Sequence, residues 1–314
     1  MDTAWEPEGF LDYRARWPNT PAFALPDLAV TERFAAVWRA DDPGPLRAVA
    51  KDTTIAFVRG YLGNYMPGNL VGPARSLTAL GFDAFVVGNR AGVCAEDNAA
   101  AIATQLRGRA RDRLLVCGHS KGGLEGLLVL RDHPELAAKC VGVALSQTPR
   151  GPSAVLESLL LRSHEGSLSG PWRRAAEHAQ RTGLYAIGAT EGGLQLTEGR
   201  IQVLVRAVEP TLAAHVVLQT ASWSSRPTTW LDSFHERLGE VRPGCAHDGQ
   251  FYLEDLVWPG LPHVLLPHLD HAQPAVGGFG FDEARYWRAI VSLVGELSGD
   301  QGGPEGKPRG TGSP

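Results

Sequence analysis

The sequence lacks the features that direct a chain into a membrane or onto nucleic acid. No apolar run approaches the roughly 18 residues that a transmembrane helix needs, so we expect no membrane span. Lys and Arg number 30 against 34 Asp and Glu, for a formal net charge of −4, so there is no basic excess to bind a phosphate backbone. The N-terminal stretch MDTAWEPEGFLDYRARWPN is acidic and interrupted by prolines, unlike the basic start and apolar core of a secretory signal.

Cysteine is also scarce. The four cysteines are Cys94, Cys117, Cys140 and Cys245, and none of them forms a CxxC pair or a Cys/His spacing typical of a zinc site. Cys117 and Cys140 lie in apolar runs, where a free thiol behaves as a small hydrophobic group. We therefore expect reduced thiols and a cytoplasmic protein. The chain has no internal repeat.

What the sequence does contain is a regular alternation of strand-like and helix-like segments. Apolar, β-branched runs are typical of buried strands, and apolar residues spaced by three and four are typical of helices. The pattern predicts strands over 53–60, 83–88, 113–118, 140–149, 215–222 and 263–270, and helices over 67–82, 96–110, 122–136 and 282–297. Asp97 or Asn98 is placed to cap the second of these helices. Because parallel strands need crossover connections, the alternation predicts an α/β protein with a mostly parallel central sheet flanked by helices.

The composition changes along the chain and suggests a division into parts. Residues 1–50 are rich in Pro, Trp and charge, and we expect them to form an extension packed on the core. The alternating segments 51–150 and 211–297 make up that core. Residues 151–210 interrupt the alternation with mostly helical patterns, which predicts a helical cap inserted into the fold. Residues 298–314 hold almost only Gly, Pro, Ser and charge, so we expect a disordered tail.

Residues 116–124 read VCGHSKGGL, with a serine between glycines at the junction of a predicted strand and helix. In such a junction Gly118 and Gly122 must be small, because the strand and the helix nearly touch. The serine at the apex takes a strained backbone conformation that lifts its Oγ above the edge of the sheet. This G-x-S-x-G pattern predicts that Ser120 is a nucleophile. It also aims the backbone N–H of Lys121 at the same point, as one donor of an oxyanion hole.

Together with four other segments, this motif resembles the α/β-hydrolase superfamily, and within it the bacterial lipase and esterase branch. The segments are RGYLGNYMPG (59–68), similar to the first oxyanion loop; QTPRGPS (147–153), similar to the segment after the next strand; HDGQFYLEDLVWPG (247–260), similar to the acid loop; and LDHAQPAVGG (269–278), similar to the histidine loop. The resemblance covers about residues 50–297. It implies the α/β-hydrolase fold and a catalytic triad in the chain order Ser, acid, His.

The resemblance places the catalytic histidine after the last strand, where His263, His268 and His271 are available. His263 begins that strand and would lie at its wrong end, because ligand sites of open α/β sheets gather at the carboxyl ends of the strands. The Asp-His pair at 270–271 matches the histidine loop of the family. We therefore expect His271 to be the general base, with His268 as the alternative.

The acid of the triad is expected before the last strand. Asp248 matches the Asp-Gly loop of the family, and a tight turn at Gly249 would bring its carboxylate to the histidine. Asp232 is the alternative because it lies closer to the preceding strand, whereas Asp270 is expected to be a turn residue.

The second oxyanion donor is expected in the loop after the first strand. By its position against the family, this donor is the backbone N–H of Tyr61. Arg59 stands where relatives often carry histidine, so Leu62 remains an alternative.

No metal or cofactor is expected. Some lipase relatives bind calcium near the histidine loop through an aspartate two residues after the catalytic histidine. If His271 is the base, that position is occupied by Gln273. Asp270 would take the place only if His268 were the base.

These features predict a serine hydrolase that cleaves carboxylic esters of small molecules or lipids through an acyl-enzyme. An acyltransferase or a thioesterase remains an alternative, because the same triad serves both. A non-catalytic binding protein on this fold is disfavoured by the complete set of Ser, acid and His. The sequence leaves the oligomeric state open and predicts no nucleic-acid partner.

Overall fold

A computed structural model describes residues 5–7, 13–22, 28–90, 92–161, 171–224 and 231–300. Within these ranges the side chains at 48, 49, 171–174, 176, 177, 232, 233 and 300 lie outside the description. Helix α14 (Glu283–Asp300) includes residues 298–300, the first three of the predicted disordered tail. The rest of the expected disordered tail, residues 301–314, falls outside the described ranges.

One sheet of six strands runs through the described part of the chain, and every strand is parallel to its neighbours. The strands are β1 (Thr53–Val58), β2 (Asp83–Val86), β3 (Arg113–His119), β4 (Cys140–Ser146), β5 (Val217–Trp223) and β6 (His263–Pro267). Their spatial order is β2-β1-β3-β4-β5-β6, so the chain changes direction across the sheet between β1 and β3. In open α/β sheets the ligand crevice lies at such a switch point, beyond the carboxyl ends of the strands.

Helices and helical turns connect the strands. In chain order they are α1 (Tyr13–Arg16), α2 (Thr31–Ala40), α3 (Gly44–Ala50), η2 (Gly63–Tyr65), α4 (Val71–Thr78), α5 (Ala95–Arg107), α6 (Lys121–Asp132), α7 (Pro134–Ala137), α8 (Ala154–Leu156), the π-helical η3 (Glu157–Leu161), α9 (Pro171–Ala186), α10 (Thr190–Leu194), α11 (Arg200–Ala214), α12 (Asp232–Val241), η4 (Leu253–Asp255), α13 (Gln273–Val276) and α14 (Glu283–Asp300).

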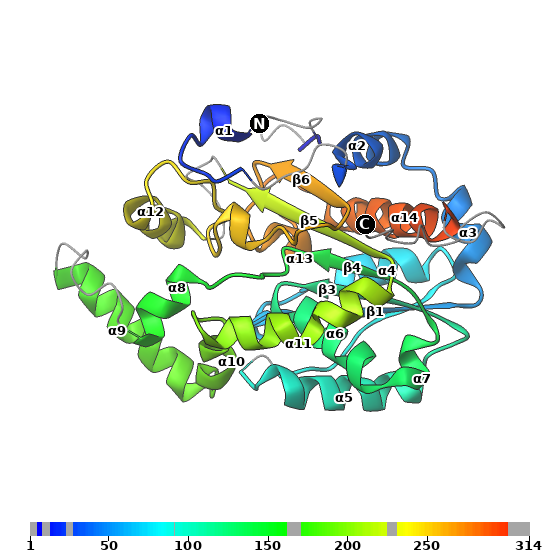
Figure 1. Cartoon of the computed structure of the whole chain (residues 1–314), viewed down its shortest axis with the longest axis horizontal. Coiled ribbons are helices and arrows are strands. Elements are labelled where there is room, and N and C mark those ends of the chain that lie inside the picture. The colour runs from blue at the N-terminus through cyan, green and yellow to red at the C-terminus, as the bar shows by residue number, and fades with distance from the viewer. Residues whose placement is uncertain are drawn as a thin grey trace, which may run out of the picture.

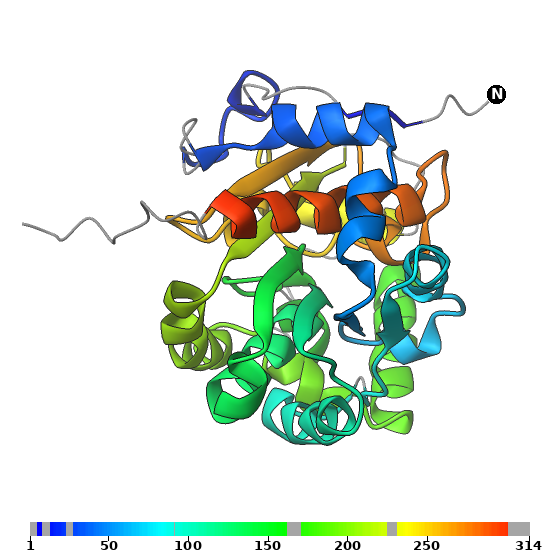
Figure 2. The same cartoon turned by 90° about the vertical axis from the view of Figure 1, so that its right-hand side faces the viewer.

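The sheet separates two hydrophobic layers. Alternate residues of a strand point to opposite faces, so Ile55 and Phe57 of β1 pack in one buried cluster and Ala56 and Val58 in the other. Helices α2, α3, α4 and α14 pack together on the first face, and α5, α6, α7 and α11 on the second (Figures 1 and 2). All six residues of β1 are buried, as expected for a strand covered on both sides.

The chain between β4 and α11 departs from the simple alternation. It forms α8, η3, α9 and α10, which Figure 1 shows at the end of the molecule toward which β5 and β6 point. Helix α11 itself packs against α6, within the layer that covers the sheet. The division into core and cap at residues 151 and 210 stays a prediction.

The predicted fold class, a parallel sheet flanked by helices, is confirmed. Two local predictions are wrong. The helix expected over 122–136 breaks at His133, because Pro134 cannot continue the preceding helix. The N-cap of α5 is Cys94, with no side-chain cap hydrogen bond, so neither Asp97 nor Asn98 caps it. In the described ranges, no helix combines the length and apolar character needed to cross a bilayer.

A buried tyrosine joins α14 to the middle of the sheet. The Tyr286 hydroxyl lies 2.8 Å from Ser146 Oγ on β4 and 2.7 Å from Thr220 Oγ1 on β5, and its ring is fully buried. Burial raises the pKa of this phenol, so it stays neutral.

Replacing Tyr286 by Phe should lower the free energy of unfolding by about 1–3 kcal/mol, because two buried hydroxyls each lose a hydrogen bond. Urea denaturation measures the change. Tyr185→Phe, at a ring that is 59% exposed, is the control and should alter stability by less than about 0.5 kcal/mol. Equal stability of the Tyr286→Phe variant and the wild type would contradict the prediction.

Candidate active site

Ser120 lies at a sharp turn between β3 and α6. Strand β3 ends at His119 and the helix begins at Lys121, and Ser120 between them has φ 55° and ψ −133°. A non-glycine residue rarely takes a positive φ, and such strain persists only where the surroundings enforce it. The Ser120 N–H donates to Ser146 O at 2.8 Å, and Ser120 O accepts from Gly123 N at 3.0 Å. The strained turn expected for a nucleophile elbow is therefore present.

The glycines around Ser120 are required by close backbone contacts. A Cβ at Gly118 would lie 2.3 Å from Gly123 Cα, across the junction of strand and helix. A Cβ at Gly122 would lie 2.3 Å from Val58 O, at the end of β1. Both distances are far below van der Waals contact, so any larger residue would push β1, β3 and α6 apart.

His271 and Asp248 form a buried pair. The His271 Nδ1–H donates to Asp248 Oδ2 at 2.6 Å, and the backbone N–H of His271 donates to Asp248 O at 2.8 Å. The other carboxylate oxygen of Asp248 accepts the backbone N–H groups of Gln250 and Phe251, both at 2.9 Å. This arrangement fixes the position of the imidazole ring from its Nδ1 side.

The charge state of Asp248 follows from these contacts. Its carboxyl group is fully buried, and burial alone would raise its pKa. The charge and hydrogen bond of His271, together with the two backbone N–H donors, outweigh burial and hold the pKa below its usual value. Asp248 is therefore a carboxylate at neutral pH.

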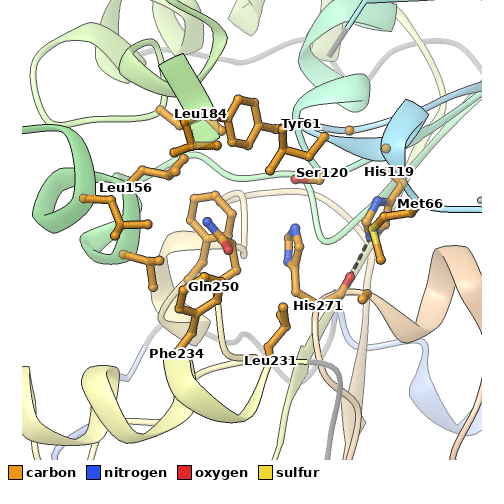
Figure 3. A pocket seen from close by; sticks show the side chains of 18 of the residues that line it. Tyr61, Met66, His119, Ser120, Leu156, Leu184, Leu231, Phe234, Gln250 and His271 are labelled. Atoms are coloured by element: carbon orange, nitrogen blue, oxygen red, sulfur yellow. Dashed lines mark hydrogen bonds between the residues drawn. The ribbon is translucent and has the colours of Figure 1, made fainter. Parts of the chain in front are cut away.

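The free side of the His271 ring faces Ser120. The Nε2 atom is buried and has no hydrogen-bond partner among the described residues. Ser120 and His271 line the same cavity, and Figure 3 shows the imidazole pointing toward the serine. The structure thus brings together Ser120, His271 and Asp248, which are far apart in the sequence.

The alternative residues lie elsewhere or have other partners. His263 begins β6, at the opposite end of that strand from the cavity, and His268 is not among the described residues that line the cavity. Asp270 Oδ1 accepts the backbone N–H groups of Ala272 and Gln273, both at 2.8 Å, as a turn residue would. Asp232 begins α12, and its side chain is outside the described part of the structure.

The loop after β1 passes directly over Ser120. A Cβ at Gly60 would lie 2.6 Å from Ser120 Cβ and 3.2 Å from Ser120 Oγ. Tyr61 and Leu62 follow Gly60 and both line the cavity. Lys121 is the first residue of α6, where backbone N–H groups have no partner within the helix. The residues expected as oxyanion donors thus lie next to Ser120 or next to Gly60, which approaches it, and the choice between Tyr61 and Leu62 stays open.

A buried ion pair next to Ser120 was not expected from the sequence. Lys121 Nζ donates to Glu125 Oε1 at 2.8 Å, and both side chains are at most 2% exposed. Asn98 Nδ2 and Asn89 Nδ2 donate to the two oxygens of Glu125, each at 2.8 Å. The spacing of Lys121 and Glu125, the two charged residues in the first three turns of α6, could have indicated a pair of this kind.

His119 is a second buried group that sequence reasoning missed. Its Nε2–H donates to His271 O at 2.7 Å, so it holds the backbone of the histidine loop. Burial, reinforced by the neighbouring His271, lowers the pKa of His119 to about 3, and the ring is neutral at ordinary pH.

The cavity over Ser120 has a volume of about 300 Å³ and a mostly apolar lining. Figure 3 shows Leu156, Leu184 and Phe234 on one side of the Ser120–His271 pair, and Met66 on the other. The apolar side chains come from η2 and its neighbours, α8, η3, α9 and α12. Such a lining accommodates an apolar group beside the serine.

The described residues hold no cluster of three His, Cys, Asp or Glu side chains placed to bind a metal ion. In the histidine loop, Gln273 Oε1 accepts the N–H of Asp270 at 2.9 Å, and Gln273 Nε2 donates to Gly278 O at 3.1 Å. Gln273 therefore closes the loop on itself at the position where some lipases carry a calcium ligand.

Comparison with solved structures identifies the fold. The chain is similar to a metagenomic carboxyl esterase, MGS0156, at 19% identity and a TM-score of 0.59, over 78% of this chain and 76% of the other. It is also similar to the mature form of the Bacillus licheniformis lipase BlEst2, at 18% identity and a TM-score of 0.55, over 78% and 92% of the two chains. No protein-family model matches the sequence, and no curated protein matches it. The protein thus has the α/β-hydrolase fold, as the sequence motifs predicted.

Because His119 stays neutral in the folded protein, its burial should destabilise the fold in acid. Below the ordinary histidine pKa of 6.5 the unfolded chain takes up a proton on His119 that the folded chain does not. The free energy of unfolding therefore falls by up to about 1.4 kcal/mol for each unit by which the pH is lowered. This loss continues until the pH approaches the pKa of His119 in the folded protein.

The His119→Asn variant should therefore lose less stability than the wild type when the pH falls from 7 to 4.5. We expect the difference in the free energy of unfolding between the two proteins to shrink by about 2 kcal/mol over this range. Urea denaturation at several pH values measures it. Parallel pH profiles of the two proteins would contradict the assignment of His119 as a buried neutral ring.

Proposed function

We propose that the protein is a serine hydrolase that cleaves carboxylic esters. The observation that carries this proposal is the His271 ring, which is anchored at Nδ1 by the buried Asp248 carboxylate. Its unpartnered Nε2 is buried in the same cavity as Ser120. This is the arrangement that a general base for serine requires. The esterase and the lipase with the same fold support it.

In the proposed reaction Ser120 Oγ attacks the acyl carbon of the ester, and His271 Nε2 takes the serine proton. Asp248 stabilises the imidazolium that forms and keeps Nδ1 as the protonated nitrogen. The backbone N–H groups of Lys121 and Tyr61 bind the developing oxyanion. His271 then gives its proton to the leaving alcohol, and water hydrolyses the acyl-enzyme by the same steps. This mechanism uses no metal and no cofactor.

The shape of the cavity supports an ester with an apolar acyl group. Leu156, Leu159 and Phe234 lie on its walls, where they would exclude water from the acyl chain. Helices α8 to α10 would then act as the cap over this acyl site. Lipid and small-molecule esters both fit this description.

The nucleophile is tested with Ser120→Ala. The variant should fold normally but lose ester hydrolysis by several orders of magnitude. It should also fail to react with a fluorophosphonate probe, which labels an activated serine. Hydrolysis of p-nitrophenyl butyrate and mass spectrometry of the labelled protein measure the two effects. Ser292→Ala, on α14 and remote from the cavity, is the control and should keep both properties. Wild-type turnover in a folded Ser120→Ala protein would refute the proposed function.

The acid is tested with Asp248→Asn, which keeps the shape of the side chain and removes its charge. Without the carboxylate, the His271 ring loses the group that fixes its tautomer and stabilises its charged form. We expect kcat to fall by roughly 10²–10⁴-fold with a small change in KM. Asp232→Asn should stay within a few-fold of wild type, and thermal melting should show that both variants are folded. The reverse order of effects would transfer the role to Asp232.

A further inference from the structure

The turn after α9 and the first residues of α10, 187–193, contact Tyr61 directly and Lys121 through the loop before α5; we call this segment the α9–α10 corner. The Tyr61 hydroxyl donates to Ala189 O in this corner at 2.9 Å. The contact is close, since a Cβ at Gly193 would lie 2.8 Å from the Tyr61 hydroxyl oxygen. Figure 3 shows Tyr61 beside Leu184, near the carboxyl end of α9. The side chain of Tyr61 therefore ties its own backbone to the corner.

Lys121 reaches the same corner through the loop that precedes α5. Its Nζ donates to Val93 O at 2.7 Å, in addition to the ion pair with Glu125. The adjacent Gly92 O accepts the N–H of Gly192 at 2.8 Å. A Cβ at Gly92 would lie 2.2 Å from Gly188 O, so the loop is in tight backbone contact with the corner.

Glu125 holds this loop and the loop after β1 together. Asn98, which donates to Glu125, also donates to Arg90 O at 2.9 Å. Asn89, which donates to the other oxygen of Glu125, also donates to Arg59 O at 2.8 Å, two residues before Tyr61. A buried network in which both oxygens of the central carboxylate are hydrogen-bonded resists small displacements of its members. It therefore holds the backbone at Arg59, two residues before Tyr61.

We propose that docking of the α9–α10 corner positions the oxyanion donors. In this inference, which rests on the proposed function, the Tyr61 hydroxyl and the Lys121 ammonium are positioning groups, and the backbone N–H groups of the same two residues bind the oxyanion. An oxyanion hole acts only if its donors are held before the charge develops. Leu184, in the last turn of α9 just before the corner, lines the cavity beside Ser120, so the corner lies next to the proposed acyl site as well as to Tyr61.

The first test compares Tyr61→Phe with Tyr65→Phe. Tyr65 donates to Ile187 O at 3.2 Å, so it contacts the same corner, but its ring is 51% exposed and does not line the cavity. Tyr61→Phe should lower kcat for p-nitrophenyl butyrate about tenfold and leave KM within twofold, because the lost contact matters only when the oxyanion forms. Inhibition by butylboronic acid, whose tetrahedral serine adduct resembles that state, should weaken in parallel. Tyr65→Phe should stay within twofold of wild type in every constant.

The second test displaces the corner without touching either donor. Gly92→Ala places a methyl group against Gly188 and Ala189, whereas the control Gly239→Ala on α12 places one in open space. Gly92→Ala should reproduce the loss of kcat, and the double variant Tyr61→Phe/Gly92→Ala should be no slower than the slower single variant, because both changes break one coupling. Gly239→Ala should be neutral.

Three results would overturn the inference: equal effects of Tyr61→Phe and Tyr65→Phe, a change confined to KM, or additive effects of Tyr61→Phe and Gly92→Ala. Labelling of wild-type Ser120 by a fluorophosphonate separates this failure from failure of the proposed function. A protein that is labelled and hydrolyses esters, but whose kcat is unaffected by Tyr61→Phe, keeps the function and loses the positioning role.

Discussion

The close approach of β1, β3 and α6 at Ser120 is the constraint on which the rest of the site depends. Glycines at 118 and 122 allow backbone atoms to meet where no side chain fits, and this contact forces Ser120 into a positive φ. The same approach brings the loop after β1 over the serine and places the first turn of α6 beside it. The proposed nucleophile and the loops that carry the proposed oxyanion donors are therefore brought together by backbone packing, to which the side-chain contacts of Tyr61 and Lys121 add.

The parts of the fold that repeat along the chain could be predicted from the sequence. Buried parallel strands are continuous apolar runs and must alternate with crossover helices, so the sheet and its direction follow from the pattern. Ser120 could be proposed from the glycines at a strand–helix junction, and His271 and Asp248 because their loops resemble the histidine and acid loops of the α/β-hydrolase family. Only the structure brings Ser120 and His271 to one cavity and Asp248 to the Nδ1 side of His271, since nothing in the spacing of residues 120, 248 and 271 shows how their loops meet.

The polar groups inside the protein could not be predicted in the same way. Asn98 looks like a helix cap in the sequence, yet its side chain is buried against Glu125 and Arg90. His119 looks like a variable motif residue, yet it holds the backbone of His271. These roles depend on partners between 8 and 152 positions away, and hydrophobic periodicity contains no information about them. Local propensity also failed at His133, where the proline that follows ends a helix that the apolar pattern would extend.

The buried network around Glu125 has a consequence for how this protein can diverge. Loss of Lys121 alone leaves a buried carboxylate without its counter-ion, and loss of Glu125 alone leaves a buried ammonium without its counter-ion and two amides with only their backbone acceptors. Either state is strongly unfavourable, whereas replacing the whole set by apolar side chains of similar volume need not be. Positions 89, 98, 121 and 125 should therefore covary in evolution. In proteins that descend from this chain, we expect the four residues to be retained together or replaced together, because a protein that keeps only part of the set would be destabilised.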